Sequence, residues 1–290
     1  MINILITGSN SYVGKSFKEW LARWPNKYSV NMISVRNDDW KKSDFSQYDV
    51  IVHMAAVVHQ KEKVEMQELY FKINRDLTLE IANKAKAEGV KQFIFMSTMS
   101  VYGLTGKISE NVVITKDTIP NPNTFYGMSK LEAEKELIKL KDNSFNIAIL
   151  RPPMIYGPNC PGNYKKLRKL AIMTTVFPEI YNQRSMIFIQ NLSEFIRLII
   201  ENREMGLFFP QNKKYVSTTK LVKLITKEHS KNIYLSRGLF RGIKLFGKRI
   251  NVLNKVFGNL VFDLSLSGYR EFQYCIIDLE KSVEICENKL

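Results

Sequence analysis

The chain has 290 residues, 45% of them hydrophobic, which is enough to bury one large core or a large and a small one. It carries a formal net charge of +15. No apolar run approaches the roughly 18 residues of a membrane-spanning helix, and the first residues run into a turn without the charged leader of a signal peptide. The three cysteines lack metal-ligand spacing. We therefore expect a cytoplasmic protein with free thiols and no metal site.

Short apolar runs alternate with helical patterns up to about residue 155. Continuous apolar strands between helices are typical of a parallel sheet covered on both faces. The pattern predicts an α/β fold with a Rossmann-like, doubly wound parallel sheet, and a dinucleotide-binding domain over residues 1–155. The predicted strands are Ile2–Thr7, Ser29–Val35, Asp49–His53, Gln92–Ser97 and Phe145–Leu150, and the predicted helices are Tyr12–Arg23, Leu69–Glu88 and Phe125–Leu140.

The alternation is lost beyond Tyr156, where prolines and glycines cluster. Helical patterns recur around Asn191–Asn202 and Thr218–His229, and Asn191 with Glu194 forms a helix-capping pattern. We predict that residues 156–290 form a smaller, mostly helical C-terminal substrate domain, with some segments returning to the sheet.

A glycine-containing turn, Thr7-Gly8-Ser9-Asn10-Ser11-Tyr12-Val13-Gly14, joins the first strand to the first helix. Glycines there let the backbone approach a pyrophosphate, and the helix N-terminus supplies donors and a favourable dipole. Position 11, where a third glycine is expected, is serine, which does not easily adopt a positive φ. After the second strand, Arg36 can pair with a 2′-phosphate. The sequence thus favours NADP(H), with NAD(H) as the alternative.

Two functional side chains four residues apart, Tyr126 and Lys130, lie on one face of a predicted helix. A neighbouring ammonium, helped by the positive charge of an oxidised nicotinamide, favours the phenolate of tyrosine, so we expect Lys130 and the bound cofactor together to bring the pKa of Tyr126 toward the working pH. Thr98 follows the fourth strand, at the edge of the sheet where ligands gather. Its hydroxyl can hold a substrate oxygen beside Tyr126.

The basic residues concentrate in the second half, with 13 Lys or Arg against two acids between Arg203 and Lys255. A solvated basic face is the ordinary interpretation. No nucleic-acid motif is present, so we expect no nucleic-acid partner. The stretch Gly242–Phe257 mixes basic and bulky apolar residues and leaves weak peripheral membrane contact open, although Gly242 and Gly247 weaken it as a helix.

These motifs resemble, in order, those of the extended short-chain dehydrogenase/reductases that act on nucleotide sugars, in the NAD-dependent epimerase/dehydratase group. The resemblance runs from residue 1 to about residue 200. It is carried by Thr7-Gly8…Gly14, Asp49–Ala56, Asn74, Ser97-Thr98…Tyr102-Gly103, Tyr126…Lys130, Leu150-Arg151-Pro152-Pro153…Pro158 and Arg184–Asn191.

The resemblance implies roles for individual residues. Thr98, Tyr126 and Lys130 would be catalytic, with Tyr126 and Lys130 also touching the cofactor. The substrate site would include Thr98, Tyr126, Asn163 and Arg184, with Arg184 on the diphosphate of a UDP-sugar. The cofactor site would include Gly8, Ser11, Tyr12, Val13, Gly14, Arg36, Ala55, Ala56 and the backbone near Pro153. Ser11 departs from the family's glycine, and Asn191 from its usual aspartate. The sequence also leaves a homodimer open.

Several reactions share this core. The dehydratases of this group place Asp-Glu directly after the catalytic threonine, where this chain has Met99 and Ser100, so we exclude dehydration. An enzyme that epimerises C3 or C5 needs a positioned pair of Cys or His side chains. We find no such pair in this sequence, so we do not favour that reaction. Hydride transfer at C4 remains. The downstream half resembles the bacterial polysaccharide-biosynthesis reductases that act on UDP-4-keto-6-deoxy-N-acetylhexosamines. We favour a 4-reductase, with a 4-epimerase that retains NAD as the alternative and a non-catalytic NADP(H)-binding regulator as a distant one.

Overall fold

Six parallel strands form the central sheet of the computed structural model, which describes residues 1–58, 63–108, 110–246 and 251–288. The strand order is β10-β6-β4-β3-β1-β2. The chain winds in one direction from β1 to β2 and in the other from β3 onward, so the topological switch point lies between β1 and β3. This confirms the predicted Rossmann-like α/β fold. The strands are β1 (Ile2–Thr7), β2 (Tyr28–Ile33), β3 (Val50–His53), β4 (Gln92–Met96), β6 (Asn146–Leu150) and β10 (Gly206–Phe208).

The chain divides into two compact units, each made of segments that are distant in sequence. Unit 1 comprises Met1–Gly103, Ile119–Pro152 and Leu192–Pro210, and it contains the whole sheet. Unit 2 comprises Leu104–Thr118, Pro153–Asn191 and Gln211–Leu290. The edge strand β10 pairs with β6 and returns residues beyond 200 to the sheet.

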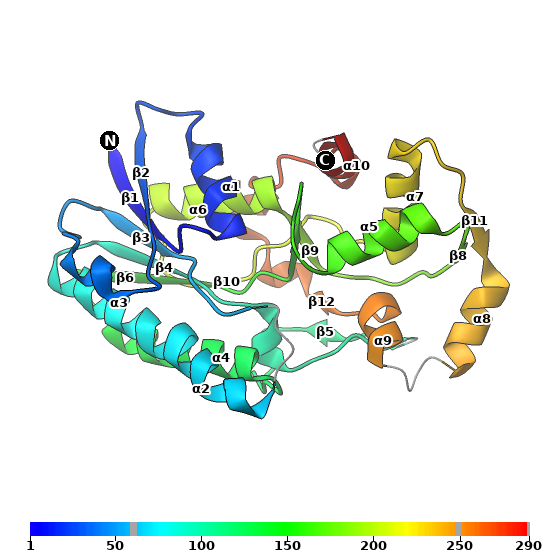
Figure 1. The fold of residues 1–290 in the computed structure, drawn as a ribbon, viewed down its shortest axis with the longest axis horizontal. Helices are drawn as coiled ribbons and strands as arrows, with labels where there is room; N and C mark the ends of the chain where they lie inside the picture. The colour runs from blue at the N-terminus through cyan, green and yellow to red at the C-terminus, as the bar shows by residue number, and fades with distance from the viewer. Residues whose placement is uncertain (59–62, 109, 247–250, 289–290) are drawn as a thin grey trace. The chain divides into compact units, whose positions relative to one another are not determined.

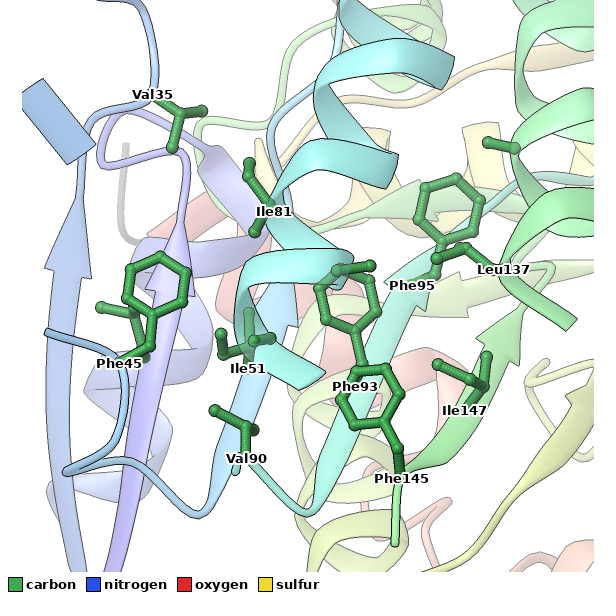
Figure 2. Close-up of a cluster of buried hydrophobic side chains, with 14 of the residues drawn as sticks. Val35, Phe45, Ile51, Ile81, Val90, Phe93, Phe95, Leu137, Phe145 and Ile147 are labelled. Carbon is green, nitrogen blue, oxygen red and sulfur yellow. The ribbon is translucent and has the colours of Figure 1, made fainter. Parts of the chain in front are cut away.

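Helices cover both faces of the sheet in unit 1 (Figure 1). Helix α1 (Tyr12–Leu21) lies with α6 (Ile189–Glu201) on one face, where the indole of Trp20 donates to Glu194 over 2.9 Å. On the other face, α3 (Leu77–Ala87) packs against α4 (Phe125–Leu140). The aromatic rings of Phe93 and Phe145 pack between this helix layer and the strands, within a cluster of buried apolar side chains (Figure 2).

The long helix predicted over Leu69–Glu88 is interrupted. It consists of α2 (Gln67–Phe71), a π-helical turn (Lys72–Asp76) and α3. The wider turn allows the side chain of Asn74 to reach backbone outside the helix, as described below. Hydrophobic periodicity does not report such a bulge, because the apolar residues on either side still fall on one face.

Unit 2 combines helices with three two-stranded sheets. Helix α7 packs against both α5 and α10. Strand β8 pairs with β11, β7 with β9, and β5 with β12, all of them parallel. The elements are β5 (Val113–Ile114), β7 (Met154–Tyr156), α5 (Asn163–Met173), β8 (Val176–Pro178), β9 (Met186–Phe188), α7 (Thr218–Glu228), β11 (Tyr234–Ser236), α8 (Arg237–Phe246), α9 (Asn251–Phe257), β12 (Val261–Phe262) and α10 (Leu279–Asn288).

Two local expectations differ from the structure. Asn191 does not begin a helix, because α6 starts at Ile189 directly after β9. Instead its buried side chain donates to the carbonyl of Ile277 over 2.8 Å and accepts from the Ile277 N–H over 3.0 Å. An aspartate, which can only accept, would not satisfy both groups. In addition, α8 continues through Gly242, whereas Gly247 lies outside the described residues.

Among the described residues, none of the helices has the length and apolar character to cross a bilayer.

Candidate active site

The turn after β1 is shaped by Gly8. Its φ is +93°, a conformation that L side chains rarely adopt. A Cβ at this position would lie 3.0 Å from both the N and the Cα of Ala55. Gly8 therefore lets the turn after β1 pass close to the backbone that follows β3, at the switch point and next to the N-terminus of α1.

Ser11 does not need the conformation of a glycine. Its φ of −63° and ψ of 128° are ordinary extended values, and its hydroxyl accepts from the N–H of Gly14 over 3.2 Å. The serine thus caps α1, a role that a glycine cannot fill with a side chain. Gly14 provides the close packing, because a Cβ there would lie 3.0 Å from the Cγ2 of Ile6.

The other residues predicted for the cofactor lie around this turn. Tyr12 and Val13 open the first turn of α1 and are half-buried. Ala55 and Ala56 follow β3, and they too are half-buried. Arg36 follows the end of β2, and its side chain is exposed.

The segment after β4 is held rigidly against the start of α4. Thr98 caps a 3-10 helix (Met99–Tyr102) by accepting from the N–H of Ser100 over 3.1 Å. A Cβ at Gly127 would lie 2.7 Å from the carbonyl oxygen of Ser100. The absence of a side chain at Gly127 therefore lets the first turn of α4 approach the loop, and this brings Tyr126 beside Thr98.

The hydroxyl of Tyr126 makes a hydrogen bond with Thr98. Burial raises the pKa of Tyr126 to about 12, and the bond with Thr98 acts in the opposite direction. Among the protein's own groups, burial has the largest effect on the pKa of Tyr126. The ammonium of Lys130 donates elsewhere, to the carbonyl of Met96 over 2.8 Å. The protein's own groups keep Tyr126 protonated at neutral pH.

Lys130 is fully buried next to Tyr126 on α4. Its Nζ lies 4.4 Å from the ring centroid of Phe95, in addition to its bond to Met96. Burial lowers the pKa of Lys130 to about 7, while the charge of Glu134 raises it. The amine therefore changes its charge near neutral pH.

A buried ion pair lies one helical turn beyond Lys130. The Nε of Arg151 donates to the Oε1 of Glu134 over 3.0 Å, and its Nη1 donates to the hydroxyl of Tyr102 over 2.8 Å. The hydroxyl of Ser97 also donates to Glu134. The pair thus connects α4 and β6 with both ends of the loop that carries Thr98.

A second buried network supports the turn after β1. The hydroxyl of Thr78 donates to the carbonyl of Asn74 over 2.9 Å, so it accepts from the Nε2–H of His53 at 2.9 Å. The Nδ1 of His53 then accepts from the hydroxyl of Thr7 at 2.7 Å. Burial lowers the pKa of His53 to about 3, so the ring is neutral and locks β1, β3 and α3 together.

Asn74 extends this network to α4. Its amide accepts from the N–H of Val57 over 2.8 Å and donates to the hydroxyl of Ser129 over 3.1 Å. Ser129 in turn donates to the carbonyl of Tyr126 over 3.1 Å. The loop after β3 and the first turn of α4 are therefore fixed to each other.

The comparisons with known proteins fit this geometry. Residues 4–207 match the model of the NAD dependent epimerase/dehydratase family. The chain belongs to this family. A UDP-glucose 4-epimerase of Vibrio cholerae is 29% identical over 289 residues, which cover 91% of this chain and 88% of that protein. The N-acetyl-alpha-D-glucosaminyl-diphospho-ditrans,octacis-undecaprenol 4-epimerase of Escherichia coli O157:H7 is 23% identical over 300 residues, covering 94% and 85%.

A solved structure shares the fold of this epimerase/dehydratase-family chain. The UDP-glucuronic acid 4-epimerase from Bacillus cereus, in complex with NAD, superimposes with a TM-score of 0.74. The match covers 99% of this chain and 96% of that one at 19% identity. At this identity the likeness shows the fold alone.

The remaining predicted residues of this family member belong to unit 2. Arg184 exchanges backbone hydrogen bonds with Val216, and its Nη1 donates to the carbonyl of Gly258 over 3.1 Å. Burial lowers the pKa of its guanidinium from the usual value. Asn163 is the exposed first residue of α5, and Pro153 is the first residue of unit 2.

The site residues predicted in unit 1 thus lie after the carboxyl ends of β1, β2, β3 and β4 and in the first two turns of α1 and α4. No function was expected from the sequence for His53, Gly127 or Glu134. Of these three residues, only Glu134 belongs to a pattern that is visible in the sequence, because it follows Lys130 by four residues on the same helix. Bonds to residues far along the chain define the role of His53.

Proposed function

We propose that this chain is an NADPH-dependent reductase of the C4 ketone of a UDP-4-keto-6-deoxy-N-acetylhexosamine, in the synthesis of surface polysaccharide precursors. The observation that carries the proposal is the hydrogen bond between Tyr126 and Thr98, beside the buried Lys130. A phenol that stays protonated at neutral pH is the proton donor that a ketone needs when it is reduced to an alcohol.

The cofactor turn fits a nicotinamide dinucleotide. The turn at Gly8 leaves no room for a Cβ beside the backbone of Ala55, and the capped N-terminus of α1 offers N–H donors to a pyrophosphate. Ala55 and Ala56 would lie beside the ribose and phosphates. Bound there, the dinucleotide supplies the hydride for the sugar carbon. The exposed guanidinium of Arg36 favours NADP(H), because it is free to reach a 2′-phosphate from the end of β2.

In this proposal Tyr126 donates its proton to the C4 oxygen as the alcohol forms, and Thr98 orients that oxygen. Lys130 would hold the hydroxyls of the nicotinamide ribose and restore the proton of Tyr126. Glu134 keeps part of the charge on Lys130 despite its burial. Each side chain thus has a task that its surroundings in the structure permit.

Unit 1 would bind the dinucleotide and unit 2 the sugar nucleotide. The family resemblance also implies that the backbone near Pro153, the first residue of unit 2, meets the nicotinamide carboxamide. Arg184 supports the assignment of the sugar nucleotide to unit 2, because a guanidinium pairs well with a diphosphate. Asn163, at the start of α5, would contact the substrate.

A 4-epimerase is the second candidate. It is favoured by the names of two relatives, a UDP-glucose 4-epimerase and an undecaprenol-diphosphate-linked N-acetylglucosamine 4-epimerase. Tyr126 would first remove and then return the proton of the C4 hydroxyl, and Thr98 would orient that oxygen. Such an enzyme consumes no reductant overall, which separates the two candidates in one assay.

The purified chain is incubated with NADPH and a UDP-4-keto-6-deoxy-N-acetylhexosamine, and the absorbance of the reduced nicotinamide is followed. We expect NADPH oxidation and one C4 alcohol by NMR. Interconversion of UDP-N-acetylglucosamine and its C4 epimer, with no oxidation of NADPH, would instead establish the epimerase. Arg36→Ala should weaken NADPH binding much more than NADH binding, and equal effects would remove the preference for NADP(H).

A further inference from the structure

Bulky apolar side chains stand exposed along one continuous part of unit 2. Met173 is 72% exposed, Tyr181 75% and Tyr234 71%. Leu170, Val176 and Leu239 are also exposed. We call these six residues the apolar strip. Exposed single hydrophobics are common on proteins, but a connected set of them marks a surface that something covers.

The connection follows from the chain and its pairing. Helix α5 ends at Met173 and leads through two residues into β8, where Val176 is the direct partner of Tyr234 on β11. Strand β11 runs straight into α8, which packs against β8. The hydroxyl of Tyr181 donates to Glu179 over 2.5 Å, and Glu179 also binds Arg237 of α8. These elements lie next to one another at one end of unit 2 (Figure 1).

The same surface is strongly basic. On α5 the three lysines Lys165, Lys166 and Lys169 are exposed and share the outer face with Leu170 and Met173, while Tyr164 and Ala171 are buried on the opposite face. Arg241 is exposed on α8. Segments 163–181 and 231–246 together contain eight Lys or Arg and one acid, Glu179. Two of the eight are paired, Arg237 with Glu179 and Arg168 with Glu287.

We propose that this surface docks the protein on an anionic phospholipid membrane. Lysines and arginines are attracted to acidic headgroups, and methionine, leucine and tyrosine side chains between them can enter the boundary with the acyl chains. A nucleic acid would account for the positive charge but not for the exposed aliphatic side chains. A second copy of the chain would bring eight more basic residues against these, at a cost in repulsion.

Membrane docking is independent of the proposed function, so either can fail alone. Membrane docking would explain the many basic residues in the second half of the chain, because binding a soluble UDP-sugar does not require so many. It also extends the membrane contact that the sequence leaves open from Gly242–Phe257 to α5, β8, β11 and the start of α8.

The test is sedimentation of the full chain with vesicles of phosphatidylcholine, with and without phosphatidylglycerol, at low and high salt. We expect binding to the anionic vesicles only, weakened by salt. The triple variant Lys165→Gln/Lys166→Gln/Lys169→Gln should bind roughly five-fold less tightly per lysine, on the order of a hundred-fold in all. The variant Met173→Ser/Tyr234→Ser, which changes two exposed side chains, should lose about ten-fold or more.

The matched control is Lys135→Gln/Lys139→Gln/Lys141→Gln, which removes the same charge from exposed positions in unit 1. It should bind nearly as the wild type does. Circular dichroism and thermal melting establish that each variant folds. Equal losses in the two triple variants, no loss in Met173→Ser/Tyr234→Ser, or no binding to anionic vesicles would each overturn the proposal. So would a wild-type dimer that Met173→Ser/Tyr234→Ser converts to a monomer.

Discussion

The buried pair of Glu134 and Arg151 makes a strong prediction about stability. Glu134→Gln leaves the guanidinium buried without a charge partner and places a donor NH₂ where Arg151 also donates. Removing one partner of a buried pair typically costs 3–5 kcal/mol. Because Arg151 keeps its bond to Tyr102, we expect the lower end, about 3 kcal/mol.

Urea unfolding followed by circular dichroism measures this loss as a lower midpoint at an unchanged slope. The double variant Glu134→Leu/Arg151→Met removes both charges and should lose only about 1–2 kcal/mol, because the hydroxyls of Ser97 and Tyr102 each lose a partner. A loss below about 1 kcal/mol for Glu134→Gln, or a double variant less stable than Glu134→Gln, would refute the assignment of a charge-dependent pair.

The same substitution also tests the electrostatics of the site. The charge of Glu134 raises the pKa of Lys130, so its removal should lower that pKa below its present value of about 7. The inflection of the turnover rate that follows Lys130 should then move to lower pH. A variant that is less stable but keeps the wild-type pH profile would show that Glu134 does not act on Lys130.

Three further outcomes follow from the geometry. Gly8→Ala should abolish tight cofactor binding, measured by nicotinamide fluorescence, because its Cβ would lie 3.0 Å from the backbone of Ala55. Gly89→Ala is the matched control, because Gly89 also has a positive φ but faces open space, and this variant should bind the cofactor normally. Ser11→Ala should cost about 1 kcal/mol in urea unfolding through the lost cap, and Ser11→Gly only a few tenths; equal losses would contradict the capping role. The pKa of His53 is about 3 in the folded chain and about 6.5 in the unfolded chain. Between these two pH values the unfolded chain binds more protons, so the free energy of unfolding should fall as the pH drops from about 6.5 to about 3. His53→Gln should flatten that fall, and an unchanged slope would show that the ring is not buried neutral.

Elements with a strong local pattern were predictable from the sequence. The strand Ile2–Thr7 and the helix Phe125–Leu140 have the predicted bounds, because their apolar runs and periodic faces are buried as one continuous core. The edge strand β10 was not assigned. Its three residues, Gly206–Phe208, carry too little pattern, and only pairing with the distant β6 makes them a strand.

The environments of the site residues were harder to predict than their presence. The spacing of Tyr126 and Lys130 suggests that the ammonium lies beside the phenol and lowers its pKa. In the structure the ammonium of Lys130 instead donates a hydrogen bond to the carbonyl of Met96. Likewise, position 11 was expected to need the freedom of glycine, whereas its backbone is ordinary and its side chain caps α1. Such outcomes depend on neighbours brought together by folding, which spacing along the chain does not encode.

The role of Tyr126 as proton donor is the central claim, and Tyr126→Phe tests it most directly. The variant keeps the ring and loses only the hydroxyl that bonds to Thr98. We predict that NADPH binding, measured by fluorescence titration, stays within a few-fold of the wild type, while turnover of the 4-keto sugar falls by roughly 10²–10⁴-fold. Turnover near the wild-type rate, with the cofactor bound normally, would contradict the proposed function of this site.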